Sequence, residues 1–231
     1  MQGIIPMIAT FLLTATPYGC NDGSSASHNF EAARFFPMTP GKAYVYQETT
    51  PDGTGEIRLQ FENPTATVDS IAASVIPMKE IVDNGVIGEF TYQAIDKTKG
   101  LLNYGEDDLE AGCVERLNPA FAIPNGLAQG STMTQVVNVA VTGTGPGCLD
   151  ASRVEYIVTY ENAETVTVPL GTYKNCAKIR IIDKWMDAAG TELAKGDKLM
   201  YLAPGVGMVK EIEFEEAGEA VMELTAIETG S

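Results

Sequence analysis

The main candidates for catalytic or metal-binding residues in this 231-residue chain are carboxylates, which are concentrated in two runs. These runs are residues 106–110 (EDDLE) and residues 211–216 (EIEFEE). If the second run is a strand, Glu211, Glu213 and Glu215 project from one face of it. Such a face could bind Ca²⁺ or supply the carboxylate pair of a glycosidase. We favour a third interpretation, a solvated face that keeps a β-protein soluble and its edges unpaired.

Other catalytic constellations are missing from the sequence. The single histidine, His28, lies in a polar stretch, so a Ser/His/Asp triad or a typical zinc site is hard to assemble. Residues 143–147 (GTGPG) are rich in glycine, but no strand–helix unit accompanies them, which indicates a turn and not a phosphate loop. We therefore predict no cofactor, no metal and no enzymatic activity.

Of the four cysteines, Cys113 and Cys148 lie in turn-rich surroundings. We predict a disulfide between them, which would close a loop of roughly 35 residues and add about 4 kcal/mol of stability if the chain-entropy model holds. Cys176 lies in a strand-like run and is expected to be a buried free thiol. The alternative is that these three thiols stay unpaired.

The N-terminal residues have the pattern of an export signal. Residues 4–15 (IIPMIATFLLTA) are uncharged, too few to span a membrane as a helix, and typical of a signal-peptide core. Cys20 follows, and the arrangement resembles a bacterial lipoprotein signal, in which the peptidase cuts before the cysteine that carries the lipid. The resemblance implies a signal peptide over 1–19 and lipid attachment at Cys20. The polar composition of residues 20–30 predicts a flexible tether, which we place at 20–35. Secretion without lipid and a buried N-terminal element are the alternatives.

Composition limits the partners. The formal net charge is −16, and so acidic a surface repels nucleic acid and anionic lipid head groups. Hydrophobic residues make up 45% of the chain, enough to bury a core in a single domain, which we place at residues 36–231. We expect membrane contact only through the N-terminal lipid, and hence a location in the bacterial cell envelope, with a periplasmic or secreted location as the alternative.

A period of two dominates the sequence from residue 40 onward. In residues 56–62 (EIRLQFE), Ile57, Leu59 and Phe61 alternate with polar residues and are expected to face a core. About eleven or twelve such segments are separated by turn signals, and no long amphipathic helix accompanies them. We predict an all-β antiparallel fold: a sandwich, a curved sheet or a partly open barrel.

A weak internal similarity favours two related sheet units in this fold. Residues 41–105 and 130–214 each open on a glycine, run through strands and a proline-containing turn, and end in a glycine-containing segment. They are candidate pseudo-repeats, joined by residues 106–130.

Three segments resemble a family of uncharacterised bacterial secreted proteins and lipoproteins. Residues 36–46 (FPMTPGKAYVY) resemble the start of its mature domain. Residues 166–176 (VTVPLGTYKNC) and 201–210 (YLAPGVGMVK) resemble its V-x-V-P-A-G-T-F-x-x-C and Y-x-A-P-G-V-G-x-V-K motifs. The resemblance implies an envelope β-domain of the kind that holds lipids or lipoproteins in a curved sheet, and the family has no established activity to carry over to this chain.

Methionines in or beside the predicted strands bear on function. They are Met78, Met133, Met200, Met208 and Met222. Their flexible side chains suit either a packed core or an adaptable binding surface. Our hypothesis is a non-enzymatic envelope lipoprotein whose β-domain binds an apolar or lipid-like ligand, or a partner protein that the sequence does not identify. The alternatives are a structural or adhesion domain without a pocket and a carboxylate-dependent hydrolase.

Overall fold

The computed structural model describes residues 29–229, with gaps at 69–70, 83–84 and 146–147. The predicted signal peptide and the lipid-attachment residue, Cys20, lie outside this part of the chain. Within it, no helix combines the length and the apolar character needed to cross a membrane.

One short helix precedes thirteen strands. The helix α1 spans Ala32–Phe35. In chain order the strands are β1 Lys42–Thr50, β2 Gly53–Phe61, β3 Thr65–Val68, β4 Ile71–Val82, β5 Val86–Asp96, β6 Gly100–Asp108, β7 Cys113–Ile123, β8 Ser131–Gly143, β9 Arg153–Val168, β10 Gly171–Met186, β11 Glu192–Ala203, β12 Gly207–Glu215 and β13 Gly218–Thr229. Short turns join most successive strands, which favours antiparallel pairing of neighbours.

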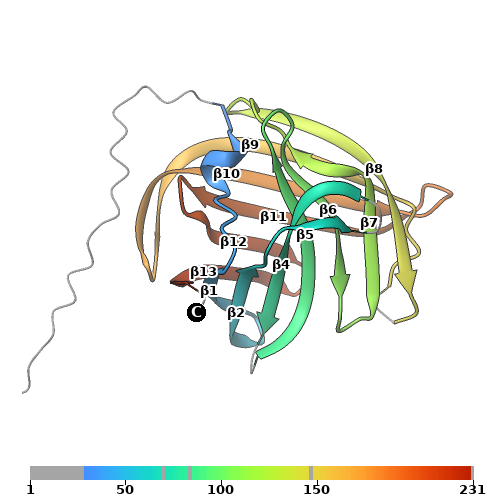
Figure 1. The fold of residues 1–231 in the computed structure, drawn as a ribbon, viewed down its shortest axis with the longest axis horizontal. Helices are drawn as coiled ribbons and strands as arrows, with labels where there is room; N and C mark the ends of the chain where they lie inside the picture. Colours follow the sequence, from blue (N-terminus) through green and yellow to red (C-terminus); the bar gives the residue numbers. More distant parts are fainter. Residues whose placement is uncertain (1–28, 69–70, 83–84, 146–147, 230–231) are drawn as a thin grey trace, which may run out of the picture.

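The strands close into a barrel (Figure 1). They follow chain order from β4 to β13, then β13 pairs with β1 and β1 with β2. β2 in turn pairs with β4, where Phe61 lies opposite Met78, and this pairing completes a ring of twelve strands. β3 pairs with β4 outside the ring. The all-β antiparallel prediction is confirmed. The closed barrel is a form that the prediction of a sandwich, a curved sheet or a partly open barrel did not specify, because periodicity does not reveal that two distant strands meet.

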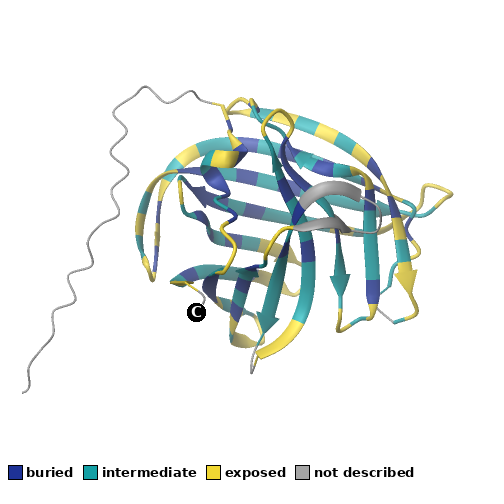
Figure 2. Cartoon of the chain, in the orientation of Figure 1, coloured by how far each residue is buried: buried dark blue, intermediate teal, exposed yellow. Residues whose placement is uncertain are grey.

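The alternation of side chains works as the sequence predicts. Ile57, Leu59 and Phe61 of β2 face the interior and are each 8% exposed, whereas Arg58 and Gln60 between them are more accessible. Figure 2 shows buried residues alternating with more accessible ones along most strands. Closing the barrel therefore gives it an inner wall of every second side chain.

β7 was missed because its sequence lacks a clean period. The predicted connection, residues 106–130, contains the end of β6 and all of β7, which carries two adjacent charged residues and Pro119. Gly105 of β6, with φ of +120°, allows the close approach of the two strands, since a Cβ there would lie 2.0 Å from the carbonyl oxygen of Glu115. With β7 in place, segments 41–105 and 130–214 are parts of one continuous sheet, and their common origin stays a prediction.

One end of the barrel, here called the plugged end, is crossed by the segment around α1. The Phe30 amide donates to the carbonyl of Leu127 in the β7–β8 turn (2.8 Å), and the Gly205 amide in the β11–β12 turn donates to the carbonyl of Arg34 (2.7 Å). Phe30 is fully buried, and its ring stacks on Phe35 at a centroid distance of 5.2 Å. The predicted tether over 20–35 is therefore wrong for its described part, because two phenylalanines anchor this segment in the core.

The opposite end, here called the far end, holds the disulfide. Cys113 begins β7, Cys148 lies in the β8–β9 connection, and their sulfurs are 2.05 Å apart. The structure thus contains the pairing that the sequence favoured. Cys176 is fully buried and unbridged among the described residues, as expected.

Candidate ligand cavity

The barrel encloses a cavity of about 510 Å³. This volume lies within the range of cavities that hold small organic ligands. The lining comes from β1, β2, β4, β5, β6, β11, β12 and β13, from the β11–β12 turn and from the segment after α1. Its residues are Phe36, Pro37, Tyr44, Tyr46, Glu48, Ile57, Leu59, Phe61, Met78, Glu80, Glu89, Thr91, Gln93, Asn103, Glu106, Lys198, Met200, Val206, Gly207, Met208, Glu211, Glu213 and Met222.

Towards the plugged end the wall is apolar. This apolar zone consists of Phe36, Tyr44, Phe61, Met78 and Met208, and the Tyr44 and Phe61 rings meet edge to face at 5.8 Å. Of the five methionines singled out from the sequence, all but Met133 line the cavity. Because methionine side chains adapt to varied shapes, this wall suits an alkyl chain or another flexible apolar group.

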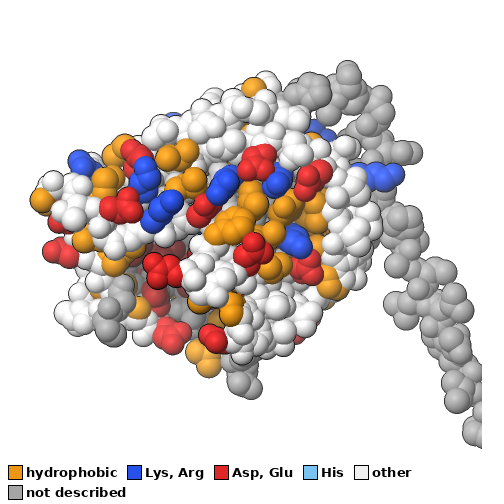
Figure 3. Space-filling view, turned by 180° about the vertical axis from the view of Figure 1, so that it is seen from behind, with side chains coloured by type: hydrophobic (Ala, Val, Ile, Leu, Met, Phe, Trp, Pro, Cys, Tyr) orange, Lys and Arg blue, Asp and Glu red, His pale blue; other side chains and the backbone are white. Residues whose placement is uncertain are grey.

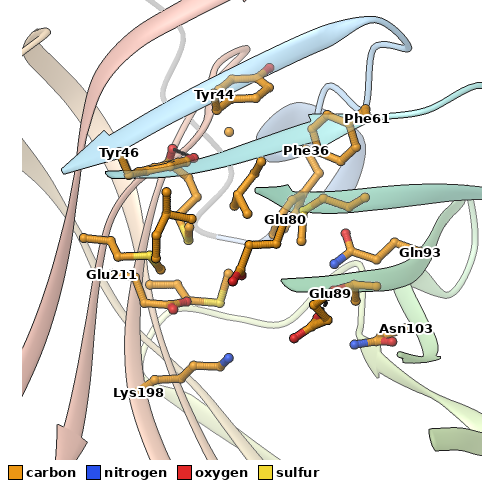
Figure 4. A pocket seen from close by; sticks show the side chains of 18 of the residues that line it. Phe36, Tyr44, Tyr46, Phe61, Glu80, Glu89, Gln93, Asn103, Lys198 and Glu211 are labelled. Atoms are coloured by element: carbon orange, nitrogen blue, oxygen red, sulfur yellow. Dashed lines mark hydrogen bonds between the residues drawn. The ribbon is translucent and has the colours of Figure 1, made fainter. Parts of the chain in front are cut away.

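Tyr46 lies between the apolar zone and the more polar wall beyond it. It is 2% exposed, and its hydroxyl donates a hydrogen bond of 2.8 Å to the backbone carbonyl of Met208 (Figure 4). Burial, followed by the nearby charges of Tyr44 and Glu211, raises the pKa of Tyr46 well above its usual value. The phenol therefore stays neutral and acts as a fixed donor that ties β1 to β12.

Towards the far end the wall is acidic. This acidic zone contains six carboxylates and one ammonium group, from Glu48, Glu80, Glu89, Glu106, Glu211, Glu213 and Lys198. Glu211 is only 8% exposed, Glu213 lines the cavity with much of its surface accessible, and Glu215 is exposed. The predicted solvated face is therefore wrong for Glu211, because the strand carrying the second acidic run turns this side chain inward.

The strand registers bring these charges together. Glu80 of β4 lies directly opposite Glu89 of β5, and Lys198 of β11 lies opposite Glu213 of β12. Directly opposed residues of an antiparallel pair have Cβ atoms about 4.5–5.5 Å apart. In Figure 4 the labelled side chains of Glu80, Glu89 and Lys198 point towards a common space. Two opposite walls thus present charge to one volume.

The pKa values report first the burial of these carboxyl groups and then the repulsion among them. Burial, followed by the charges of Glu89 and Glu48, raises the pKa of Glu80 to about 7. Burial, followed by the charges of Glu89 and Glu115, raises the pKa of Glu106 to about 8. The Glu211 charge, against the opposing effect of burial, raises the pKa of Lys198, which stays an ammonium ion. The zone is therefore short of positive charge.

The first acidic run is split between two roles. Glu106 lines the cavity, whereas Asp107 pairs with the Arg116 guanidinium at 2.8 Å and accepts a hydrogen bond of 2.6 Å from the Tyr92 hydroxyl. Across the part of the chain that the structure describes, no three Asp, Glu, His or Cys side chains are placed to hold a metal ion. The Ca²⁺ alternative for Glu211 and its neighbours thus has no ligand cluster there.

Charges on the outer wall of the barrel behave differently. Figure 3 shows Lys and Arg side chains lying beside Asp and Glu across the back of the molecule. Cross-strand ion pairs at 2.7–2.9 Å account for several of them: Lys178–Glu161, Arg180–Asp197, Lys184–Glu155 and Lys210–Glu223. The excess of carboxylate inside is therefore a local property of the cavity and not only a consequence of the acidic composition.

Local sequence patterns point to Glu211, Glu213 and four of the lining methionines, but not to the opposite wall of the cavity. Glu80 and Glu89 lie in separate strands with no local motif. The sequence does contain an indication that both carboxylates face inward, because each shares a strand face with apolar residues. His28 lies outside the described residues.

Comparison with known proteins supports the fold. No protein-family profile matches the chain, and no curated protein matches it. A Bacteroides fragilis NCTC 9343 protein, provisionally described as exported and with a YmcC-like fold, is 13% identical with a TM-score of 0.50, over 88% of this chain and 100% of that one. A Parabacteroides distasonis ATCC 8503 protein, provisionally described as a lipoprotein, is 15% identical with a TM-score of 0.44, over 84% of this chain and 98% of that one. At such identity the likeness shows the fold alone.

Proposed function

We propose that this protein is a non-enzymatic envelope lipoprotein whose barrel binds an apolar or lipid-like ligand in its interior. The observation that supports this is the cavity of about 510 Å³, whose apolar zone is rich in methionine and aromatic side chains. A structural or adhesion domain would be expected to fill its interior, because an unfilled apolar space costs stability.

Native mass spectrometry of the protein purified from cells, followed by organic extraction, tests the proposal. We expect a bound mass that leaves on extraction. Met200→Trp, which narrows the cavity, should reduce the amount of bound mass, while Val136→Trp, at a position 53% exposed, should retain it. A wild-type protein that is ligand-free and binds no apolar probe would contradict the proposal.

The envelope location is the second part of the proposal. It is supported by the signal-like residues 4–15 and by Cys20. Cys20→Ala should stop incorporation of labelled palmitate and move the protein from the membrane fraction to the soluble fraction. If the wild-type chain takes up no label, the lipid anchor is wrong, although a secreted barrel could still bind its ligand.

A carboxylate-dependent hydrolase is the second candidate, favoured by one observation. Glu80 and Glu89 face each other in the cavity, and the raised pKa of Glu80, about 7, suits a general acid. Turnover of a panel of nitrophenyl glycosides that is lost in Glu80→Gln and kept in Glu216→Gln, an exposed turn variant, would establish it. Equal, background rates for all three proteins would leave the binding function.

A further inference from the structure

The cavity joins an apolar pocket to a charged one, which is the shape of a site for an amphiphile. The apolar zone lies at the plugged end, where Phe36 follows α1, and the acidic zone lies towards the far end, where Glu80 and Glu106 are close to the ends of their strands. A ligand that fills both zones needs an apolar tail and a polar head group.

We propose that the ligand is a single-chain amphiphile with a cationic head group, an inference that rests on the proposed ligand-binding function. Its tail lies in the apolar zone, and its head group lies between the carboxylates of β4 and β5 on one side and those of β12 on the other. The volume of about 510 Å³ suits one chain and not the two chains of a membrane phospholipid.

The sign of the head group follows from the charges that line the cavity. Six carboxyl groups and one ammonium group face it. Glu80 and Glu106 have raised pKa values of about 7 and 8, and a bound cation favours their ionised forms, so a cation meets attraction from most of the wall. An anionic head group such as a fatty-acid carboxylate would find Lys198 as its only cation among the described lining residues and would add to the repulsion around it. Electrostatic complementarity therefore favours a cation.

Glu211 gives a second, independent indication. It is more than nine-tenths buried, yet it forms no hydrogen bond and no ion pair at contact distance with any residue that the structure describes. Its charge partner is Lys198, whose pKa it raises at longer range. Buried carboxylates are normally paired, because burial without a partner costs free energy. On the opposite wall Glu80 likewise forms no ion pair within the described chain, and a bound cation would serve both groups.

Lys198 neutralises only part of the negative charge in the cavity. It lies opposite Glu213, and the charges nearest to it are those of Glu211 and Glu213 on the neighbouring strand β12. Glu80 and Glu89 come from β4 and β5, which are on the other side of the barrel. The head group of the ligand is therefore expected to lie closer to Glu80 and Glu89 than to Lys198.

Isothermal titration of the full chain with three probes of equal tail length tests the head-group charge. The probes are dodecyltrimethylammonium and dodecanoate, each below its micellar concentration, and dodecanol below its solubility limit. The protein is first refolded from urea to release molecules bound during purification. We expect the cation to bind at least about tenfold more tightly than the alcohol, and the alcohol more tightly than the carboxylate.

Variants separate the electrostatic contribution from the apolar one. The double variant Glu80→Gln/Glu211→Gln should weaken the cation about tenfold or more and leave the alcohol nearly unchanged, whereas Glu216→Gln, in the exposed β12–β13 turn, should change neither. Lys198→Met should strengthen cation binding, which gives a gain-of-affinity result if the double variant fails to fold.

The outcomes distinguish this inference from the proposed function. If all three probes bind with similar affinity, or dodecanoate binds best, the cavity binds amphiphiles but the cationic head group is wrong. If none of the three binds, the proposed ligand-binding function fails as well.

Discussion

The two zones of the cavity lie in the same barrel but carry opposite energetic consequences. The apolar zone buries rings and methionines such as Phe61 and Met78, and each such burial favours folding. The acidic zone holds Glu80 and Glu106 in surroundings that raise their pKa, so their charged forms oppose folding at neutral pH. A wall that weakens the fold while its neighbour strengthens it is typical of a binding site and not of a structural core.

The largest expected effect comes from a substitution that removes a ring packed at the plugged end, next to the apolar zone. Phe30→Ala empties a fully buried position that stacks on Phe35 and meets Tyr160 edge to face at 6.4 Å. We expect a loss of about 3–5 kcal/mol in the free energy of unfolding, measured by urea denaturation. Phe214→Ala, at an outer-wall ring that is 37% exposed, is the control and should cost far less. Equal losses would mean that the plug does not support the barrel.

The next effect concerns the far end, which holds the disulfide. Replacing both Cys113 and Cys148 with alanine should lower the free energy of unfolding by about 2–4 kcal/mol. A reducing agent should produce the same loss in the wild type and no further loss in the variant. If the variant is as stable as the wild type, the acidic end does not depend on the covalent link.

The inner wall was only partly predictable from the sequence, and the reasons differ between the zones. Ile57, Leu59 and Phe61 were placed correctly because alternation along one strand is local information. The second acidic run was found, but Glu211 was assigned to solvent because a carboxylate on a strand usually faces water. Its inward direction depends on where β12 lies in the ring, which no local pattern encodes.

The closure of the barrel and the burial of the segment around α1 could not be predicted from the sequence for a related reason. The β2–β4 pairing skips β3, so the strand that completes the ring is not the next one in the chain. Phe30 was assigned to a tether because the residues before it are polar, although Phe30, Phe35 and Phe36 in a short span indicated burial. The polar composition of the preceding residues thus placed Phe30 and Phe35 in the tether, whereas Phe36 already lay in the predicted domain.

A third prediction concerns pH and tests the cost of the acidic zone. Glu80, Glu106 and Glu115 have folded-state pKa values of about 7, 8 and 7, against an ordinary value of 4.5 that the unfolded chain is expected to show. The folded protein therefore binds more protons than the unfolded chain between about pH 4.5 and pH 8, and stability should fall as pH rises through that window. The slope is at most about 1.4 kcal/mol per pH unit for each group, and less where solvent screens it.

Urea unfolding at several pH values between 5 and 9 measures this slope, roughly spanning the window in which the carboxyls titrate. Glu106→Gln should flatten the dependence of the free energy of unfolding on pH. At the upper end of the pH range it should stabilise the protein by about 1 kcal/mol, because a neutral amide replaces a carboxylate that burial disfavours. Glu216→Gln, in an exposed turn, should leave the slope unchanged. A stability that rises over this range would show that the interior carboxylates are not destabilising.

The smallest expected effect lies between the zones, at Tyr46. Tyr46→Phe removes the hydroxyl that donates to the Met208 carbonyl at 2.8 Å and should cost about 1 kcal/mol, measured by urea denaturation. Tyr104→Phe, at a partly accessible position, is the matched control and should change stability by less. Tyr46→Phe should weaken the binding of dodecanol only slightly, because the ring that borders the apolar zone stays in place. A large loss of dodecanol binding with little loss of stability would instead make the Tyr46 hydroxyl a contact of the ligand, and the division between the zones would then lie deeper in the cavity than Tyr46.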